Sequence, residues 1–414
     1  MKVLEFTAYG TIDGKRGFSR NQSGYGYMTV DIAVAIAASN VCVDMLTQSY
    51  FTGGFAHRGV SIRKRRFADV MRHARLVDLS NGIRRARAAR NRGLFYKLRV
   101  LMYSVSMGYA RHILHTGDYD VVHIHGISDY TVPMLSLCQE LQVRFVVTLH
   151  GLYSFEDNPD RIDPTNLEKR FLQFANESRS PVTVISTGVR RRILEFLGVT
   201  SSENFIVIPN AVGGFDESVH AQGLTSVDGG SSDEKTTGIV VGNICERKNQ
   251  VQVVRALALL PKGDLEKLLV VFAGRETEAG RFESYIRGLG VSASAKYIGH
   301  VARRSIGDLY RLGDFTIVAS KSEGFGLSSI EGFQFGLPTV IFSDLDAFPD
   351  IRDDDSVVPV YGRSDQDLAD GLKRALKRSW NATRIRDHGA KFSMNAMGEH
   401  YKYVMTKAID AVIL

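Results

Sequence analysis

The chain has 414 residues, of which 44% are hydrophobic and 23% charged, and it carries a net charge of +7. These values are ordinary for a globular protein and exclude a disordered or fibrous chain; at roughly 100 to 200 residues per domain they predict two or three domains. No window approaches the roughly 18 uncharged apolar residues that a transmembrane helix needs, which excludes a purely integral membrane protein.

Short apolar, β-branched runs alternate with helical patterns along most of the chain. Strands are predicted at 3–7, 41–47, 121–125, 145–149, 182–185 and 205–208, and in the second half at 238–241, 268–273, 296–298, 315–319 and 339–342. Helices are predicted between them, for example at 28–38, 187–197, 250–260, 305–312 and 330–335. Repeated strand–helix–strand units predict an α/β fold with doubly wound parallel sheets.

The alternation breaks once, at residues 213–237, which are polar, rich in Gly and Ser, and predicted to be a linker. It separates an N-terminal domain, 1–212, from a C-terminal domain, 238–394, and we expect a ligand in the cleft where the strand ends of the two face each other. Residues 395–414 have apolar side chains at helical spacing, so we expect a terminal amphipathic helix that packs back on the N-terminal domain.

The excess positive charge is concentrated in residues 58–99, which contain fourteen Lys and Arg against Asp69 and Asp78. Such a segment should seek an anionic partner. Within it, a helical apolar stripe is ringed by arginines: the stripe is Phe67, Val70, Met71, Ala74 and Val77, and the arginines are Arg65, Arg66, Arg72 and Arg75. This helix could lie on an anionic membrane leaflet, or it could pack its stripe on the domain with the arginines in solvent.

The most informative segment is 320–340, SKSEGFGLSSIEGFQFGLPTV, which runs from a predicted strand through a Gly-rich loop into a helix. Glu323 lies on the loop and Glu331 on the helix, and Gly324, Phe325 and Gly326 expose backbone N–H groups near the helix N-terminus. Such a loop favours phosphate or other anions, and a neighbouring carboxylate can accept hydrogen bonds from sugar hydroxyls. The spacing is equally compatible with a plain turn carrying two surface glutamates.

This segment resembles the E-x7-E signature of the family-four retaining glycosyltransferases, which have the GT-B architecture of two Rossmann-like domains. Further segments agree in order: DYDVVHIHG at 118–126, VVTLHG at 146–151, VTVISTGVRRRI at 182–193, VIPNAV at 207–212 and VVGNICERKNQ at 240–250. The resemblance therefore covers most of the chain. It implies a nucleotide-sugar donor, transfer with retention of configuration, and a GT-B fold.

Position by position, the resemblance implies that Glu331 holds the donor ribose hydroxyls and that Glu323 faces the donor sugar. It implies that the amides of Phe325, Gly326 and Leu327 meet the sugar or the diphosphate.

The resemblance also implies a diphosphate site in the loop that starts at Gly242, where the family commonly has an Arg and a Lys five positions apart. Lys248 is in place, but Asn243 stands at the Arg position. A neutral amide cannot neutralise phosphate charge as a guanidinium does. Arg247 could substitute, or it could be a solvated loop charge.

In the first half, His150 stands where similar enzymes place a histidine near the donor sugar, although a strand-end His is often a core or capping residue. Gly24 and Gly26 lie where the family has a Gly-rich loop that approaches the acceptor and the phosphates; without the resemblance they form only a flexible turn. His123 and His125 share one face of a strand, but a metal site is not expected there, because no third ligand at suitable spacing accompanies them.

Three D-x-D strings begin at Asp118, Asp344 and Asp353. The first introduces a strand and the others occupy loops after a strand, which favours a structural role over metal binding. We therefore predict a metal-independent enzyme, with no protein nucleophile, in which fixed cations and amides stabilise the departing diphosphate.

The predicted partners are a nucleotide-sugar donor, a glycan or lipid-linked acceptor of cell-surface polysaccharide synthesis and, through 58–99, an anionic membrane surface. The alternatives are a nucleotide-sugar epimerase or a phosphorylase-like enzyme of the same architecture. A nucleic-acid binder is a remote alternative, because the basic segment has few interleaved aromatic residues. The three scattered cysteines and the absence of an apolar run at the N-terminus predict a cytoplasmic protein, peripheral to the inner membrane face if 58–99 binds lipid.

Overall fold

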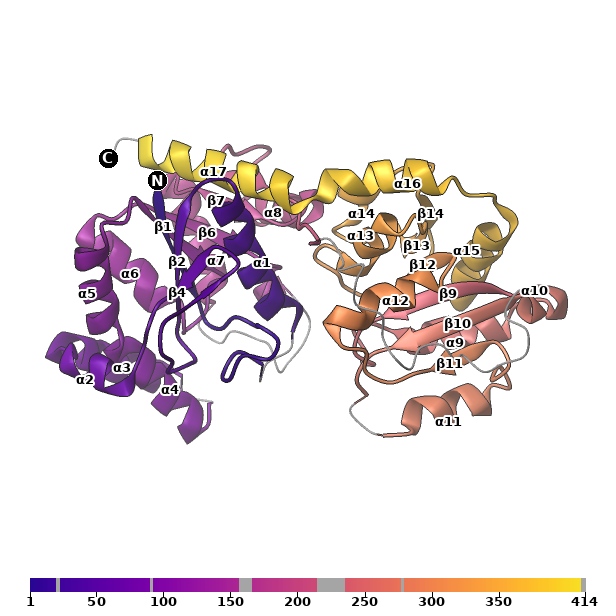
Figure 1. Cartoon of the computed structure of the whole chain (residues 1–414), viewed down its shortest axis with the longest axis horizontal. Coiled ribbons are helices and arrows are strands. Elements are labelled where there is room, and N and C mark those ends of the chain that lie inside the picture. Colours follow the sequence, from indigo (N-terminus) through magenta and orange to yellow (C-terminus); the bar gives the residue numbers. More distant parts are fainter. Residues whose placement is uncertain (20–22, 90–91, 156–165, 214–234, 277–278, 411–414) are drawn as a thin grey trace. The chain divides into compact units, whose positions relative to one another are not determined.

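The computed structural model describes residues 1–19, 23–89, 92–155, 166–213, 235–276 and 279–410 (Figure 1). These form two compact units: an N-terminal unit made of Met1–Asn210 and Met394–Leu414, and a C-terminal unit made of Ala211–Ser393. Most of the predicted linker, 213–237, lies outside the described residues.

The N-terminal unit is built on an eight-stranded sheet with the order β3-β4-β2-β1-β5-β6-β7-β8, in which all neighbours are parallel except β3 and β4. Its strands are β1 (Lys2–Thr7), β2 (Cys42–Thr47), β3 (Phe55–His57), β4 (Val60–Ile62), β5 (Val121–His125), β6 (Phe145–Leu149), β7 (Val182–Val184) and β8 (Phe205–Val207). The hairpin of β3 and β4 was not predicted from the sequence, because each strand has only three residues. Its turn, Arg58-Gly59, has positive φ at both residues, as tight hairpin turns require.

Nine α-helices are described in this unit: α1 (Gly24–Ala38), α2 (Phe67–Arg72), α3 (Leu76–Ala88), α4 (Leu94–Val105), α5 (Met107–Gly117), α6 (Val132–Leu141), α7 (Leu167–Ser178), α8 (Thr187–Leu197) and α17 (Met394–Asp410). The C-terminal helix α17, yellow in Figure 1, runs beside α1. A Cβ atom at Gly398 would lie 2.1 Å from the carbonyl oxygen of Ala35, so glycine allows the two helices this close approach. The last four residues of the predicted terminal helix lie outside the described residues.

The prediction of one continuous amphipathic helix between Arg65 and Leu79 is wrong. It is divided into α2 and α3. At the end of α2 the backbone N–H of His73 donates to the carbonyl oxygen of Val70 at 3.2 Å, and the imidazole Nδ1 of His73 bonds the carbonyl oxygen of Asp69 at 2.8 Å. Of the apolar stripe only Val70 is buried, while Phe67, Met71 and Val77 are exposed. Arg65, expected among the ringing arginines, is itself buried and donates to the carbonyl oxygen of Gln48.

The C-terminal unit has a parallel six-stranded sheet with the order β11-β10-β9-β12-β13-β14. Its strands are β9 (Thr236–Val241), β10 (Leu268–Ala273), β11 (Ala295–Tyr297), β12 (Phe315–Val318), β13 (Thr339–Phe342) and β14 (Val357–Val360). Its helices are α9 (Gln250–Ala258), α10 (Lys262–Glu266), α11 (Arg281–Gly288), α12 (Ile306–Arg311), α13 (Leu327–Gln334), α14 (Phe348–Ile351), α15 (Asp365–Lys377) and α16 (Ala382–Gly389). Strand β14 was not predicted. Strand β9 begins two residues inside the predicted linker, because the β-branched Thr236 and Thr237 pair with Leu268 and Leu269 of β10.

Candidate active site

In the C-terminal unit, two loops that follow neighbouring strands bring three charged side chains together. Strands β9 and β12 are parallel neighbours, so the loops at their carboxyl ends, 242–249 and 319–326, lie at the same edge of the sheet. Lys248 Nζ lies 2.6 Å and Arg247 NH1 3.4 Å from Glu323 Oε2. Three of the predicted site residues thus form one cluster, which we call the Glu323 cluster.

The Glu323 carboxylate stays ionised although only 14% of its side chain is exposed. Burial raises its pKa, but the charges of Lys248 and Arg247, together with hydrogen bonds from Lys248 and Ser320, outweigh burial and hold the pKa below its ordinary value. The cluster is therefore an ion triad in which two cations share one carboxylate. An incoming anion could share these cations.

Backbone contacts hold Arg247, and a glycine makes room for Lys248. Arg247 NH1 donates to the carbonyl oxygen of Ser322 at 3.1 Å, and the backbone N–H of Lys321 donates to the carbonyl oxygen of Arg247 at 2.8 Å. Gly242 has a φ of 143°, and a Cβ atom there would lie 3.3 Å from Cε of Lys248, so glycine leaves room for the lysine stem.

Asn243, which stands where the family commonly has an arginine, does not belong to the triad. Its side-chain oxygen accepts from the backbone N–H of Arg275 at 3.3 Å, and Gln250 Nε2 donates to its backbone carbonyl at 3.0 Å. The amide side chain therefore ties its loop to the end of β10, whereas Arg247 lies beside Lys248.

The predicted anion-binding turn leads into α13. Gly326, with a φ of 75°, precedes the helix, and Phe325 is buried against Phe392, their ring centroids 5.8 Å apart. On the helix, Glu331 Oε2 accepts a hydrogen bond from the Tyr310 hydroxyl at 2.6 Å. Tyr310 is fully buried, and burial together with the Glu331 charge raises its pKa well above the ordinary value, so it remains a donor that orients the carboxylate.

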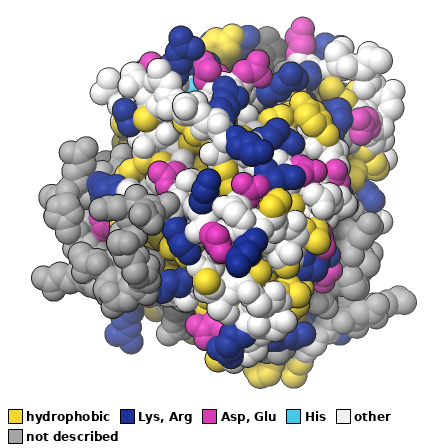
Figure 2. Space-filling model, turned by 90° about the vertical axis from the view of Figure 1, so that its right-hand side faces the viewer, with side chains coloured by type: hydrophobic (Ala, Val, Ile, Leu, Met, Phe, Trp, Pro, Cys, Tyr) yellow, Lys and Arg dark blue, Asp and Glu magenta, His cyan; other side chains and the backbone are white. Residues whose placement is uncertain are grey.

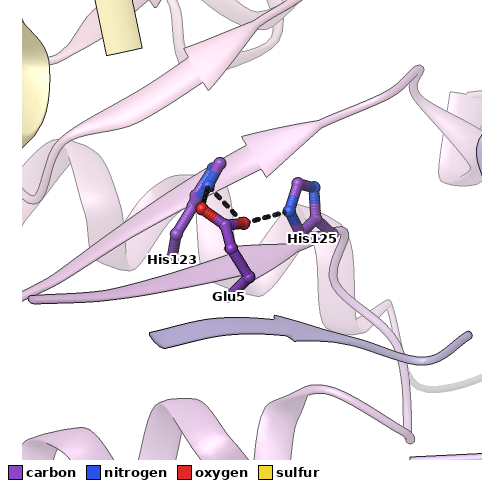
Figure 3. A group of neighbouring side chains, drawn as sticks. All are labelled: Glu5, His123 and His125. Atoms are coloured by element: carbon purple, nitrogen blue, oxygen red, sulfur yellow. Dashed lines mark hydrogen bonds and ion pairs between the residues drawn. The ribbon is translucent and has the colours of Figure 1, made fainter. Parts of the chain in front are cut away.

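In the N-terminal unit, the partly buried His150 lies at the end of a chain of buried polar side chains. His150 Nε2 lies 3.0 Å from His125 Nδ1, and His125 Nε2 lies 2.6 Å from Glu5 Oε2. His123 Nδ1 lies 3.0 Å from the other carboxylate oxygen of Glu5, and its Nε2 lies 2.6 Å from the hydroxyl of Thr148. Figure 3 shows the Glu5 carboxylate between the two imidazoles of β5.

This arrangement corrects one step of the sequence argument. A third side chain of a type that can bind metal, Glu5, does lie beside His123 and His125. The parallel register of β1 and β5 pairs Glu5 with His123, although 118 positions of sequence separate them. Its signal was present: a glutamate inside the otherwise apolar strand 3–7. The ring nitrogens that face Glu5 are within hydrogen-bond distance of its oxygens, so hydrogen bonding accounts for the cluster.

Gly24 and Gly26 form the first turn of α1. A Cβ atom at Gly26 would lie 2.1 Å from the Thr11 hydroxyl oxygen. A Cβ atom at Gly24 would have no other atom within 4 Å. The backbone N–H of Gly26 donates to the side chain of the N-cap residue Ser23 at 3.1 Å. Close packing therefore explains Gly26, and nothing in the structure explains Gly24.

One carboxylate of each D-x-D string has a protein partner. Asp120 Oδ2 accepts from the backbone N–H of Lys2 at 2.6 Å, Asp344 pairs with Arg363 at 2.7 Å, and Asp355 with Arg384 at 3.0 Å. These contacts agree with the structural role that the sequence favoured.

Comparison with known proteins identifies both halves of the chain. Residues 24–213 match the family model described as Glycosyltransferase Family 4, and residues 225–392 match the model described as Glycosyl transferases group 1. A D-inositol 3-phosphate glycosyltransferase of Corynebacterium aurimucosum is 24% identical over 316 residues, which cover 72% of this chain and 73% of that protein.

Solved structures show the same fold. A sucrose-phosphate synthase of Thermosynechococcus elongatus aligns over the whole of both chains with a TM-score of 0.68 at 14% identity. The HepE protein of Anabaena, solved in complex with UDP-glucose, aligns over 98% of this chain and all of that one, with a TM-score of 0.63 at 15% identity. With its two parallel-sheet, Rossmann-like units and both family matches, the chain belongs to the family-four glycosyltransferases, enzymes of the retaining hexosyltransferase class with the GT-B fold.

Proposed function

We propose that the C-terminal unit binds a nucleotide-sugar donor through the Glu323 cluster and Glu331, and that the enzyme transfers the sugar to a hydroxyl of a glycan or lipid-linked acceptor. The observation that carries the proposal is the ion triad of Lys248, Arg247 and Glu323. Two fixed cations beside the Gly-rich start of α13 suit a diphosphate, and the carboxylate suits sugar hydroxyls. The Anabaena protein that was solved with UDP-glucose supports a UDP-sugar as the first donor to test.

The proposed mechanism follows from the charges. When the bond between the anomeric carbon and the diphosphate oxygen breaks, positive charge develops on the carbon and negative charge on the leaving group. Lys248, Arg247 and the amides of residues 325–327 would stabilise the leaving diphosphate. The acceptor hydroxyl would attack from the same face, and its proton would pass to an oxygen of the leaving phosphate. Configuration is then retained without a protein nucleophile.

A donor screen tests the binding step. Among UDP-, GDP- and dTDP-sugars, one class should raise the melting temperature of the wild type, since a ligand at 100 times its Kd adds about 2.7 kcal/mol to the free energy of unfolding. Glu331→Ala should lose this shift, while the control Glu283→Ala, a change at an exposed position of α11, should keep it. A shift that survives Glu331→Ala would remove Glu331 from the donor site.

The donor chemistry is proposed to be independent of a metal ion, because Lys248 and Arg247 supply the positive charge that a divalent ion otherwise brings to a diphosphate. Turnover should be the same in EDTA as in its absence. Loss of turnover in EDTA, restored by Mg²⁺ or Mn²⁺, would contradict this part of the proposal.

For the acceptor side, we propose that helices α2, α3 and α4 face an anionic membrane at the cytoplasmic side, where the enzyme would extend a lipid-linked glycan of a cell-surface polysaccharide. Large apolar side chains are exposed here to an unusual degree, Leu76 to 86%, Phe95 to 84% and Leu94 to 70%, and they lie within the segment that carries the excess of basic residues. The face drawn in Figure 2 differs, because Lys and Arg are interspersed there with Asp and Glu. No helix among the described residues is long and apolar enough to cross a bilayer.

Liposome co-sedimentation tests this surface. Binding should rise with the anionic lipid content, and Arg84→Gln with Arg87→Gln should weaken it by roughly 2 kcal/mol, at about 1 kcal/mol for each basic residue near the surface. The matched control removes two exposed lysines of the C-terminal unit, Lys262→Gln with Lys267→Gln, and should leave binding unchanged. Sedimentation that does not depend on anionic lipid would contradict the membrane surface while leaving the donor site untouched.

A further inference from the structure

A pocket of about 510 Å³ lies between helices α3, α6 and α7 of the N-terminal unit, and its lining combines two kinds of side chain. Leu135 of α6 and Phe171 and Phe174 of α7 form an apolar wall, in which the centroids of the two phenyl rings lie 6.4 Å apart. Three arginines line the same pocket: Arg84, Arg85 and Arg170. The volume is in the range of small-molecule sites, about 300 to 1,000 Å³.

Arg85 is a partly buried cation without a strong partner. Burial lowers the pKa of its guanidinium, an effect that Asp129 opposes and the like charge of Arg84 increases. The group still carries its charge at neutral pH, because a guanidinium is deprotonated only in strong base. Its NH2 group donates to the neutral Ser136 hydroxyl at the long distance of 3.4 Å. Since a cation removed from water needs compensation, an anion beside Arg85 would be favourable.

The pocket contains more positive than negative charge. The carboxylate of Asp129, also in the lining, accepts a hydrogen bond from the Tyr96 hydroxyl. Arg84 donates to the amide oxygen of Asn81 at 3.1 Å. Within the described parts of the chain, none of the three arginines forms an ion pair with a carboxylate. A ligand with an anionic group would therefore find cations that are not already paired.

We propose that this pocket binds one molecule of a phosphorylated lipid, with the phosphate beside Arg84 and Arg85 and the hydrocarbon chain against Phe171 and Phe174. Free phosphate would leave the apolar wall uncovered, and a neutral chain would leave the cations unpaired. The inference rests on the proposed membrane surface and deepens it, because α3 belongs to both. It adds a site of fixed stoichiometry to a surface that attracts anionic lipids in general.

Calorimetric titration with decyl phosphate, below the concentration at which it forms micelles, tests the pocket without a membrane. One molecule should bind per chain. Octyl phosphate, two CH₂ groups shorter, should bind roughly tenfold more weakly. Inorganic phosphate, which lacks the chain, and decyl maltoside, which lacks the charge, should each bind at least about tenfold more weakly than decyl phosphate. Equal binding of decyl maltoside, or no saturable binding of decyl phosphate, would overturn the proposal.

The variant Arg85→Gln tests the cation. It should weaken the binding of decyl phosphate about tenfold, the effect expected for one hydrogen bond to a charged group, and should leave decyl maltoside unaffected. The matched control is Arg191→Gln, because Arg191 is an exposed arginine of α8 outside the pocket lining. Equal affinities for decyl phosphate in Arg85→Gln and the control would remove Arg85 from the site.

The variant Ala88→Phe tests the pocket itself without removing a charge. Ala88 lines the pocket at an exposed position at the end of α3, so a phenyl ring there should fill the cavity while the fold tolerates it. Binding of decyl phosphate should be lost. The control Ala68→Phe, at an exposed position of α2 outside the lining, should bind as the wild type does. Thermal unfolding shows whether each variant is folded, and wild-type binding by a folded Ala88→Phe would place the site elsewhere.

Liposomes distinguish this site from the proposed membrane surface. Phosphatidylcholine vesicles that contain phosphatidic acid should bind the wild type more tightly than vesicles with the same fraction of phosphatidylserine. Ala88→Phe should lose this preference and keep its binding to phosphatidylserine vesicles. If both vesicles bound equally well and decyl phosphate did not bind, the pocket proposal would be wrong and the surface would stand. If decyl phosphate bound but no anionic vesicle did, the membrane surface would be wrong and the pocket would stand.

Discussion

Glu5 and Glu323 are both shielded carboxylates, but the two units compensate them in different ways. Glu5 is fully buried and its partners are two buried imidazoles, of which His125 has a pKa lowered to about 4 and is neutral at pH 7. Glu323 is 14% exposed, and its partners are a lysine and an arginine. A fully buried carboxylate with buried imidazole partners offers no exposed charge to a ligand, whereas a carboxylate with two partly exposed cations can share them. The first arrangement suits positioning, and the second suits binding an anion.

The largest expected effect comes from removing the cation closest to Glu323. Lys248→Met should lower kcat/KM by a factor that corresponds to about 2 to 4 kcal/mol of lost transition-state stabilisation. This is the range found when a hydrogen-bond donor to a developing negative charge is deleted. The control is Lys321→Met, because Lys321 pairs with the exposed Glu246 and is half exposed itself. Steady-state kinetics with the identified donor would measure both. Near-normal turnover in Lys248→Met would end the contrast between the two clusters, because the ion triad would then be structural as well.

Acid should affect the N-terminal cluster before the C-terminal one. The pKa of His125 falls from 6.5 to about 4 on folding, so the unfolded chain takes up the proton first as the pH drops. The free energy of unfolding should therefore fall between about pH 6.5 and about pH 4, by about 3 kcal/mol from this group. His150, whose pKa is also lowered, acts in the same direction. The Glu323 carboxylate, with its lowered pKa, loses its contribution only below its ordinary pKa of 4.5.

Urea unfolding at pH 7 and at pH 4.5 checks this ordering. His125→Asn should be less stable than the wild type at pH 7 and should lose less stability on acidification. If the wild type and the variant lost the same amount, His125 would not be the group that responds to acid. Another titrating group would then have to account for the loss of stability in acid.

The difference between the clusters also explains what the sequence could and could not predict. Glu323, Lys248 and Arg247 lie in two short loops whose motifs are local in sequence. The resemblance reached Glu323 and Lys248 directly, and Arg247 was considered as a substitute for the arginine absent at Asn243. Glu5 reaches His123 and His125 only through the register of β1 and β5, and Tyr310 reaches Glu331 from α12, a separate helix. Contacts of this kind depend on strand register and helix packing, which hydrophobic periodicity does not specify.

The fold shows the same limit. The long apolar strands of both sheets were predicted because parallel strands covered on both faces are continuously apolar. The hairpin of β3 and β4 and the short strand β14 were missed, and the helix between Arg65 and Leu79 was predicted in one piece. The chain leaves the helical path at His73, where the imidazole bonds the Asp69 carbonyl oxygen, and hydrophobic periodicity does not indicate such a break. The predicted cleft between the two halves stays a prediction.

A smaller effect is expected from the hydrogen bond between the neutral Tyr310 hydroxyl and the Glu331 carboxylate in the C-terminal unit. Tyr310→Phe removes the hydroxyl that donates to Glu331 and leaves the ring in place. Donor affinity should fall by about 1 to 2 kcal/mol, because Glu331 is no longer held in one orientation. Calorimetric titration with the donor measures this, and Tyr297→Phe, which removes a hydroxyl bonded to the Gly274 carbonyl, is the control. Unchanged affinity in Tyr310→Phe would show that Glu331 does not need this donor.

The smallest effect concerns Arg247, which is 38% exposed and therefore better screened than Lys248. Arg247→Gln should lower kcat/KM by about 1 kcal/mol, as expected for a solvent-accessible pair. If Arg247 replaces the arginine that the family commonly has at the position of Asn243, then Asn243→Arg in the wild type should change kcat/KM by the equivalent of less than about 0.5 kcal/mol. The same change should restore most of the loss in Arg247→Gln.

A double-mutant cycle separates this replacement from independent effects. Because Asn243 bonds the backbone of Arg275, Asn243→Arg also breaks a contact, and thermal unfolding of each variant measures that cost separately. Coupling between the two positions means that either guanidinium can neutralise the same phosphate charge. If Asn243→Arg raised kcat/KM equally with and without Arg247, Arg247 would be a solvated loop residue. Lys248 would then be the cation of the Glu323 cluster that faces the diphosphate.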